Sequence, residues 1–366
     1  MKEKEKQLFK ALCKFKDRFA DPSLSEFATP GVLGHLFFNR MQGVAFDVLK
    51  SNGVLGKVNR EFRNSLSAAY DQNIQKNESL KQCIILLLEI LSGCNCKIAM
   101  LKGAYLCFHY PQGCRTSNDV DLLIEPKDVT TVGTLLVSAG FEQGNIRNGE
   151  FVPATRQEII ESKMMRGETV PYIKEVNLPF MKFFEVDINF SLDYKNGTEM
   201  VLSDMLSHVC IKKEKGLFIP TLDDTDFFIH LCAHLYKEAT TLPWIQMHRD
   251  MTLYKYCDIY LLLSEMTELQ LQHIFARAAA LGMDKICAYT ILETMNLFDI
   301  DHPCFYRLAC YALEKDPDFC LKVISPKDKK TLQYQTADAT KRFFMESRIH
   351  DLKEIDTHEK TSYAAK

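Results

Sequence analysis

The stretch Met100–Pro126, MLKGAYLCFHYPQGCRTSNDVDLLIEP, determines how this chain is interpreted. A short apolar run leads into Lys102-Gly103, and the stretch closes with Asp119-Val120-Asp121 followed by three apolar residues. Residues two apart in a strand point to the same face, so the two aspartates present their carboxylates together. Such a pair is either a solvated strand face or a metal site that handles phosphates. Other features of the sequence are needed to distinguish these two interpretations.

The segments around this stretch predict an α+β fold. The runs KIAML and DVDLLIE suit buried strands, and FFEVDINFSL alternates apolar and polar residues as a half-buried strand does. Helical spacing dominates before and after these runs. We therefore expect a small mixed β-sheet core with helices, flanked by N-terminal helices and a C-terminal helical bundle. The expected boundaries are 1–70 for the N-terminal helical region, 71–195 for the α/β core and 196–366 for the C-terminal helical domain.

One helix is expected directly before the core. The run NESLKQCIILLLEILSGC has apolar residues at helical spacing, with Asn77 or Ser79 as candidate N-caps and Gly93 as a stop. From Thr221 onward helices are expected to dominate, and the final polar run DLKEIDTHEKTSYAAK is expected to fray.

Composition limits the classes of partner. The chain has 366 residues, 46% of them apolar and 25% charged, which is typical of a soluble globular protein. Its formal net charge of -3 and the absence of a basic stripe argue against binding of long nucleic acid. The longest apolar run, CIILLLEILSGC, is interrupted by Glu89 and is too short to span a bilayer, so no membrane partner is expected.

The cysteines indicate the compartment. There are 13 of them, an odd number, scattered without zinc-ribbon or CxxC spacing. The N-terminal run MKEKEKQLFKALCKF has the pattern of a charged amphipathic helix and not of a secretory signal. We expect free thiols and a cytoplasmic location.

Magnesium suits a close pair of carboxylates, because it prefers oxygen ligands and binds through one or two carboxylates together with substrate phosphates. Two like charges this close repel unless a cation lies between them. A third carboxylate on a neighbouring strand would allow a second ion. Asp187 in EVDINF is the candidate, because it lies on the polar face of the second alternating strand.

Cationic and small residues accompany the acids. Lys102-Gly103 lies at a predicted strand-to-helix junction, where glycine lets the backbone approach a phosphate. Arg115 comes just before the aspartate pair. A single loop arginine is often solvated or paired with an acid, but this position favours a phosphate contact.

This combination resembles the DNA polymerase β-like nucleotidyltransferase superfamily, and more closely its uncharacterised bacterial family. The matching elements span roughly Leu80 to Ser264. They are Leu101-Lys102-Gly103, Tyr110, Arg115, the run Asn118–Ile124, the strand Val186–Leu192, and the helical runs FFIHLCAHLYKEA and LYKYCDIYLLL.

The resemblance implies a magnesium-dependent transferase that uses two ions and an NTP such as ATP. It implies that Asp119, Asp121 and Asp187 are both the metal ligands and the catalytic residues. The implied nucleotide-binding residues are Lys102, Gly103, Arg115, His234 and Lys237. NMP would pass to a hydroxyl of a small-molecule or protein acceptor, with release of pyrophosphate. The sequence indicates neither the acceptor nor the oligomeric state.

Two departures from the family pattern leave a second class open. Gly103-Ala104 replaces the Gly-Ser or Gly-Gly of the wider superfamily, so a phosphate-binding hydroxyl is missing. Asn189-Phe190 replaces the His-Trp of the close family. The alternative is a non-catalytic nucleotide-binding or regulatory protein, antitoxin-like or degenerate, and a purely structural helical protein is a third possibility.

The histidine spacing in FFIHLCAHLYKEA has two interpretations. His230, His234 and Lys237 share one helix face. A zinc site would need further ligands, and no Glu follows His230 as in metalloprotease helices. We therefore expect His230 to face the core. The resemblance places His234 and Lys237 at the nucleotide, and the alternative for Lys237 is an exposed, snorkelling side chain.

Overall fold

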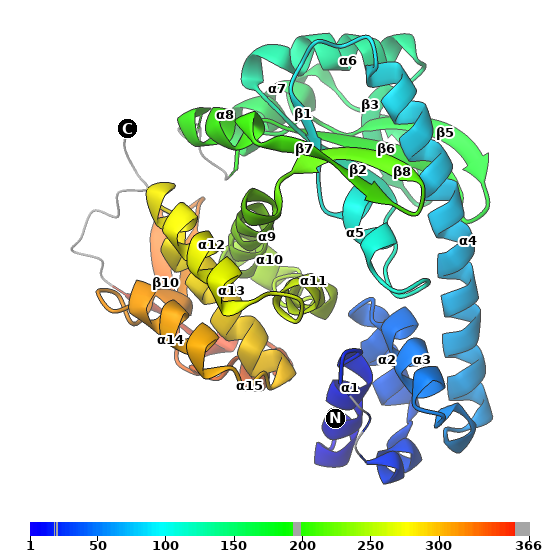
Figure 1. Ribbon diagram of the computed structural model, residues 1–366, viewed down its shortest axis with the longest axis vertical. Coiled ribbons are helices and arrows are strands. Elements are labelled where there is room, and N and C mark those ends of the chain that lie inside the picture. The colour runs from blue at the N-terminus through cyan, green and yellow to red at the C-terminus, as the bar shows by residue number, and fades with distance from the viewer. Residues whose placement is uncertain (18, 20, 193–198, 356–366) are drawn as a thin grey trace. The chain divides into compact units, whose positions relative to one another are not determined.

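The computed structural model describes residues 1–17, 19, 21–192 and 199–355 (Figure 1). The chain divides into two compact units. The sheet unit comprises residues 42–47 and 63–227, and the helical unit comprises residues 1–41, 48–62 and the described residues from Phe228 on. The domain boundaries expected at residues 70 and 195 stay a prediction.

The sheet unit is built on a mixed six-stranded sheet of order β1-β2-β6-β5-β3-β4. Strands β2 and β6 run parallel, and the other neighbouring pairs are antiparallel. The strands are β1 (Ile98–Met100), β2 (Asp119–Ile124), β3 (Glu142–Arg147), β4 (Glu150–Pro153), β5 (Tyr172–Leu178) and β6 (Met181–Asn189). The predicted α+β fold with a small mixed sheet is confirmed.

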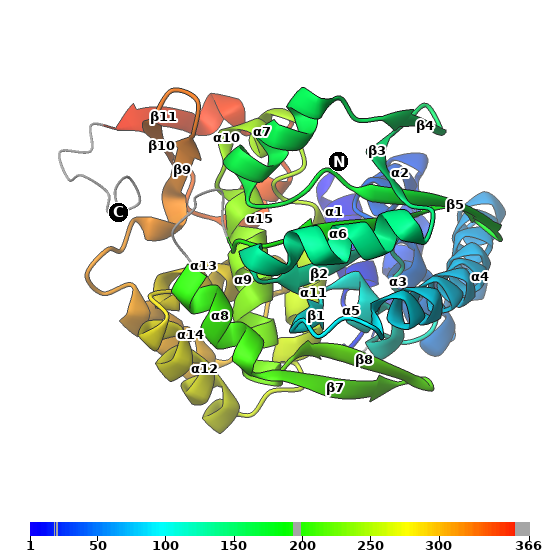
Figure 2. The same ribbon diagram turned by 90° about the horizontal axis from the view of Figure 1, so that it is seen from above.

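Helices and a hairpin accompany this sheet (Figure 2). The helices in this part of the chain are α3 (Gln42–Ser51), α4 (Arg60–Leu91), α5 (Gly103–His109), α6 (Val129–Ser138), α7 (Arg156–Arg166) and α8 (Glu199–Ser207). The hairpin pairs β7 (Val209–Glu214) with β8 (Leu217–Leu222).

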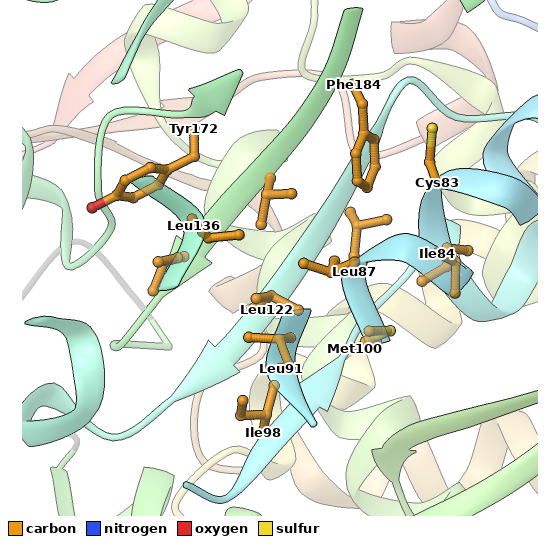
Figure 3. Packing of buried hydrophobic residues seen from close by; sticks show 14 of the residues in the cluster. Cys83, Ile84, Leu87, Leu91, Ile98, Met100, Leu122, Leu136, Tyr172 and Phe184 are labelled. Atoms are coloured by element: carbon orange, nitrogen blue, oxygen red, sulfur yellow. The ribbon is translucent and has the colours of Figure 1, made fainter. Parts of the chain in front are cut away.

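The core of the sheet unit lies between one face of the sheet and the helices α4 and α6 (Figure 3). Strand β2 contributes alternate residues, with Val120, Leu122 and Ile124 in this core. Val186 and Ile188 of β6 lie in the same cluster. Because side chains alternate along a strand, the residues between them face the other side of the sheet. The apolar face of β2 and β6 thereby fixes the orientation of their polar residues.

The N-cap prediction at Asn77 or Ser79 is wrong, because α4 is one continuous helix from Arg60 to Leu91. Both polar side chains make tertiary hydrogen bonds from within the helix. Asn77 Nδ2 donates to the carbonyl of Arg115 at 2.8 Å, and Ser79 Oγ donates to the carbonyl of Pro179 at 2.8 Å. Polar residues inside a helix can mark a docked loop as well as a helix start.

The helical unit contains a small sheet that the sequence pattern missed. Its strands β9 (Lys322–Ser325), β10 (Lys330–Tyr334) and β11 (Leu352–Ile355) form an antiparallel sheet of order β11-β10-β9. Helices dominate from Thr221 onward, as expected, but these three strands, each four or five residues long, were not predicted. The helices here are α1 (Glu3–Cys13), α2 (Pro30–Phe38), α9 (Asp224–Ala239), α10 (Leu242–Gln246), α11 (Leu253–Leu263), α12 (Glu268–Ala280), α13 (Asp284–Phe298), α14 (Pro303–Ala312) and α15 (Ala339–Phe343).

Two further expectations concern the whole chain. All thirteen cysteines lie in the described ranges and are free thiols. Among the residues that the structure describes, no helix has both the length and the apolar content to cross a membrane. The cytoplasmic location stays a prediction.

Candidate active site

Four acidic side chains lie on the face of β2 and β6 opposite the core. The parallel register pairs Asp119 with Glu185 and Asp121 with Asp187. Register partners on neighbouring strands point to the same side of a sheet. The structure thus brings the three predicted carboxylates together and adds Glu185. We call these four residues the carboxylate face.

Lys102 contacts this face directly. Its Nζ lies 2.9 Å from Asp121 Oδ1, and the two side chains are 18% and 10% exposed. The same oxygen accepts a weaker hydrogen bond from Asn189 Nδ2 at 3.4 Å. Lys102 comes next to Asp121 because the amide of Leu101 donates to the Asp121 carbonyl at 2.9 Å. The predicted grouping of Lys102 with the carboxylates is therefore present as an ion pair.

Asp119 is held in its ionised form. Burial opposes ionisation, but a hydrogen bond from Ser117 Oγ and the charges of Lys102 and Arg115 together keep the pKa of Asp119 below its ordinary value. The Arg115 side chain is buried, and its Nη1 donates to the carbonyl of Thr116. The predicted Arg115 thus acts on the same face through its charge.

The pKa values of Asp187 and Glu185 are shifted in the opposite direction, upward. Burial, with the charges of Asp121 and Asp119, raises the pKa of Asp187 well above its ordinary value. Burial and the charge of Asp119 likewise raise the pKa of Glu185. Neighbouring carboxylates that pull one another's pKa values apart lack sufficient compensating positive charge. A cation at this face would relieve that repulsion.

Side chains of α4 hold the loop that precedes β2 in place. Asn73 Nδ2 donates to the carbonyl of Gly113 at 2.9 Å, one turn before the Asn77 bond to Arg115. Gly113 has a φ of +77°, and a Cβ there would lie 2.6 Å from the Tyr70 ring. Glycine is thus required at this position. These contacts set where Arg115 enters the site.

Gly103 has a packing role. A Cβ on Gly103 would lie 2.7 Å from both Cβ and Oγ of Ser117, the residue that holds Asp119. The preceding Lys102 adopts a φ of +38°, a region that side chains disfavour. The close approach of this junction to the loop explains the glycine. Its predicted contact with a phosphate stays a prediction.

His234 and Lys237 belong to the helical unit. His234 Nε2 lies 3.4 Å from Glu238 Oε1 on α9, and Glu238 also pairs with Lys255. The Lys237 side chain is half-buried, and the His230 side chain is buried. The nucleotide contacts expected of His234 and Lys237 stay a prediction.

A second acidic group lies at the start of α9. His208, Asp223 and Asp226 bring one ligand atom each within 4.8 Å of one another, and they are the one such set of three His, Cys, Asp or Glu in the described ranges. Asp223 Oδ1 accepts from the Asp226 amide at 2.8 Å, and His208 Nδ1 lies 2.9 Å from Asp226 Oδ2. Asp223 therefore caps the N-terminus of α9, and His208 pairs with Asp226 in the first turn of that helix.

The carboxylate face fits a divalent ion by its donor chemistry. Magnesium prefers oxygen ligands, and the register of β2 and β6 places carboxylates of two adjacent strands on one face. The three predicted acids are less closely grouped than the His208 set, which alone in the described ranges brings three ligand atoms within 4.8 Å of one another. Asp119, Asp121 and Asp187 are the residues that would hold the ion.

Sequence reasoning missed Glu185, Ser117 and Asn189 as parts of this site. Glu185 was recoverable, because it precedes Asp187 by two residues on the same alternating strand. The contacts of Ser117 and Asn189 depend on loop geometry and strand register, which the pattern alone does not fix.

A family model described as an uncharacterised nucleotidyltransferase matches residues 32–299, which is most of the chain. The chain therefore belongs to this family of nucleotidyltransferases, as its motifs predicted. No curated protein matches it.

Proposed function

We propose that this protein is a magnesium-dependent nucleotidyltransferase. It moves NMP from an NTP such as ATP to a hydroxyl of a small-molecule or protein acceptor and releases pyrophosphate. The observation that carries the proposal is the parallel pairing of Asp121 with Asp187, which sets three acids on one face in a chain of this family.

Asp119 and Asp121 serve as metal ligands, and Asp187 completes a second metal site. Bound divalent ions supply neutralisation of phosphate charge and activation of the acceptor hydroxyl. Asp119 is suited to this role because Ser117, Lys102 and Arg115 keep it ionised. Asp187, on the same face as the other two acids, is assigned to help deprotonate the acceptor hydroxyl.

In the reaction, the acceptor oxygen forms a bond to the α-phosphorus and the bond between that phosphorus and the leaving pyrophosphate breaks. Lys102 and Arg115 are the cations of the sheet unit that we assign to the phosphates, because both act electrostatically on Asp119. Gly103 keeps the Lys102 backbone close to the loop that carries Ser117. His234 and Lys237 are assigned to the nucleotide on the family resemblance alone.

The test is transfer of label from α-labelled NTP to a panel of hydroxyl acceptors, with pyrophosphate release measured in parallel. The wild type releases pyrophosphate only when a divalent ion is present. The matched variants Asp119→Asn and Asp121→Asn bring release to background, while Glu150→Gln, an exposed acid of β4, leaves it unchanged.

The competing function is nucleotide binding without chemistry. It is favoured by Ala104, which removes the hydroxyl found in the wider superfamily. Calorimetry that finds tight NTP binding with no pyrophosphate release across the acceptor panel would establish that alternative and contradict the transferase.

A further inference from the structure

Lys102 and Asp121 form an ion pair at the position where the proposed function needs a metal ligand. The ammonium lies on Asp121 Oδ1 at 2.9 Å, and little of either side chain is exposed. An ammonium at this distance uses a lone pair that a divalent ion would otherwise take. A divalent ion that binds Oδ1 of Asp121 would therefore have to displace the ammonium.

The charge of Lys102 reaches the other ligands as well. Its charge acts on Asp119 and on Asp187 as well as on Asp121. A single ammonium thus compensates part of the charge that a metal would compensate at the same face. The lysine stabilises the same arrangement of acids that a bound ion stabilises.

The backbone of Lys102 is fixed on both sides. Leu101 pairs with Asp121 upstream, and downstream the amides of Tyr105 and Leu106 donate to the Lys102 carbonyl at 3.1 and 2.8 Å. These hydrogen bonds on both sides hold the Lys102 backbone at its unfavourable positive φ. With the backbone held, the four-carbon side chain is the part of Lys102 that can move away from Asp121.

We infer that Lys102 is a built-in competitor of the divalent ion, which holds Asp121 until metal displaces it. This inference rests on the proposed function and concerns the regulation of the same site. Two roles of Lys102, phosphate binding and competition with the metal, predict different metal affinities. A lysine that only binds phosphate leaves the metal affinity without nucleotide unchanged, whereas a competitor weakens it.

The experiment is calorimetric titration of the full-length protein with Mn²⁺ in the absence of nucleotide. Lys102→Met keeps the length of the side chain and removes its charge. We expect it to lower the Kd for Mn²⁺ about tenfold, the size of a charged hydrogen bond that no longer has to be broken. Lys102→Arg keeps a cation at the site and retains an affinity close to that of the wild type.

The matched control is Lys76→Met. Lys76 acts on Glu185 through its charge, and it is also in the sheet unit. If this variant tightens Mn²⁺ binding as much as Lys102→Met does, the effect is long-range charge and the competition is contradicted. Melting curves of each variant establish that it is folded before titration.

Asp121→Asn separates failure of this inference from failure of the proposed function. If this variant loses the Mn²⁺ site and Lys102→Met binds no more tightly than the wild type, the competition is wrong and the metal assignment stands. If Asp121→Asn binds Mn²⁺ like the wild type, the metal assignment is wrong, and the inference falls with it.

Discussion

Carboxylates are removed from water in two regions of this molecule, and their negative charge is compensated differently in each. In the helical unit, Asp250 accepts from Nε and Nη2 of Arg348, both at 2.6 Å, and Glu293 is paired with Arg342. Each of these acids has its own guanidinium. On the carboxylate face, four acids share a small set of cations, and burial together with the charges of neighbouring acids raises the pKa values of Asp187 and Glu185. A buried acid with its own arginine is structural, whereas a group of under-compensated acids is suited to bind a cation.

The largest expected effect is on turnover. Asp119→Asn and Asp121→Asn each lower nucleotidyl transfer by on the order of a thousandfold, because a ligand of the proposed metal is lost. Their unfolding free energies fall by about 1–3 kcal/mol, because Asp119 loses its charged hydrogen bond with Ser117 and Asp121 loses its ion pair with Lys102. Pyrophosphate release and urea unfolding measure the two effects. Wild-type turnover in either variant contradicts the assignment.

The reverse pattern is expected in the helical unit. Arg342→Met leaves Glu293 buried without its partner and costs about 3–5 kcal/mol of unfolding free energy at neutral pH. Burial already raises the pKa of Glu293, so the folded state binds the proton more tightly than the unfolded state does. Stability is therefore lost as pH rises through the raised pKa, and the cost of Arg342→Met shrinks at lower pH. Urea unfolding at pH 5.5 and pH 7.5 measures this, and an equal cost at both values would show that Glu293 is not the cause.

Metal addition distinguishes the two regions by stability. Mg²⁺ at a hundredfold excess over its Kd raises the unfolding free energy of the wild type by about 2.7 kcal/mol. Asp121→Asn removes this gain, and Arg342→Met, although less stable, keeps it. Thermal melts with and without Mg²⁺ measure the difference. An Mg²⁺ gain that survives in Asp121→Asn would place the ion elsewhere.

The smallest effect concerns a glycine beside the carboxylate face. Gly103→Ala places a Cβ 2.7 Å from Ser117 and costs about 1–3 kcal/mol through overpacking. The matched change Gly34→Ala, in α2 with no atom within 4 Å of the new Cβ, is neutral or stabilising by about 0.5–1 kcal/mol. Denaturant unfolding of the two variants compares them, and equal effects would mean that the junction is not tightly packed.

The orientation of the acids in β2 and β6 could be predicted because valine and aspartate alternate in both strands. Val120 and Val186 face the core, so Asp121 and Asp187 had to face away from it. Their direct pairing could not be predicted, since strand order and register depend on the whole sheet. Asn77 shows the other limit. Its side chain has the chemistry of a helix cap, and only tertiary structure shows that it holds the carbonyl of Arg115. Likewise, the strand Lys322–Ser325 is too short and polar for its period to be recognised.

In the proposed function, the acids of β2 and β6 hold the divalent ion that nucleotidyl transfer requires. Anomalous scattering from crystals soaked with Mn²⁺ and a non-hydrolysable NTP shows where that ion binds. We expect a manganese peak coordinated by Asp119 and Asp121, with Lys102 moved off Asp121. A peak at His208, Asp223 and Asp226, with none at the carboxylate face, would contradict it.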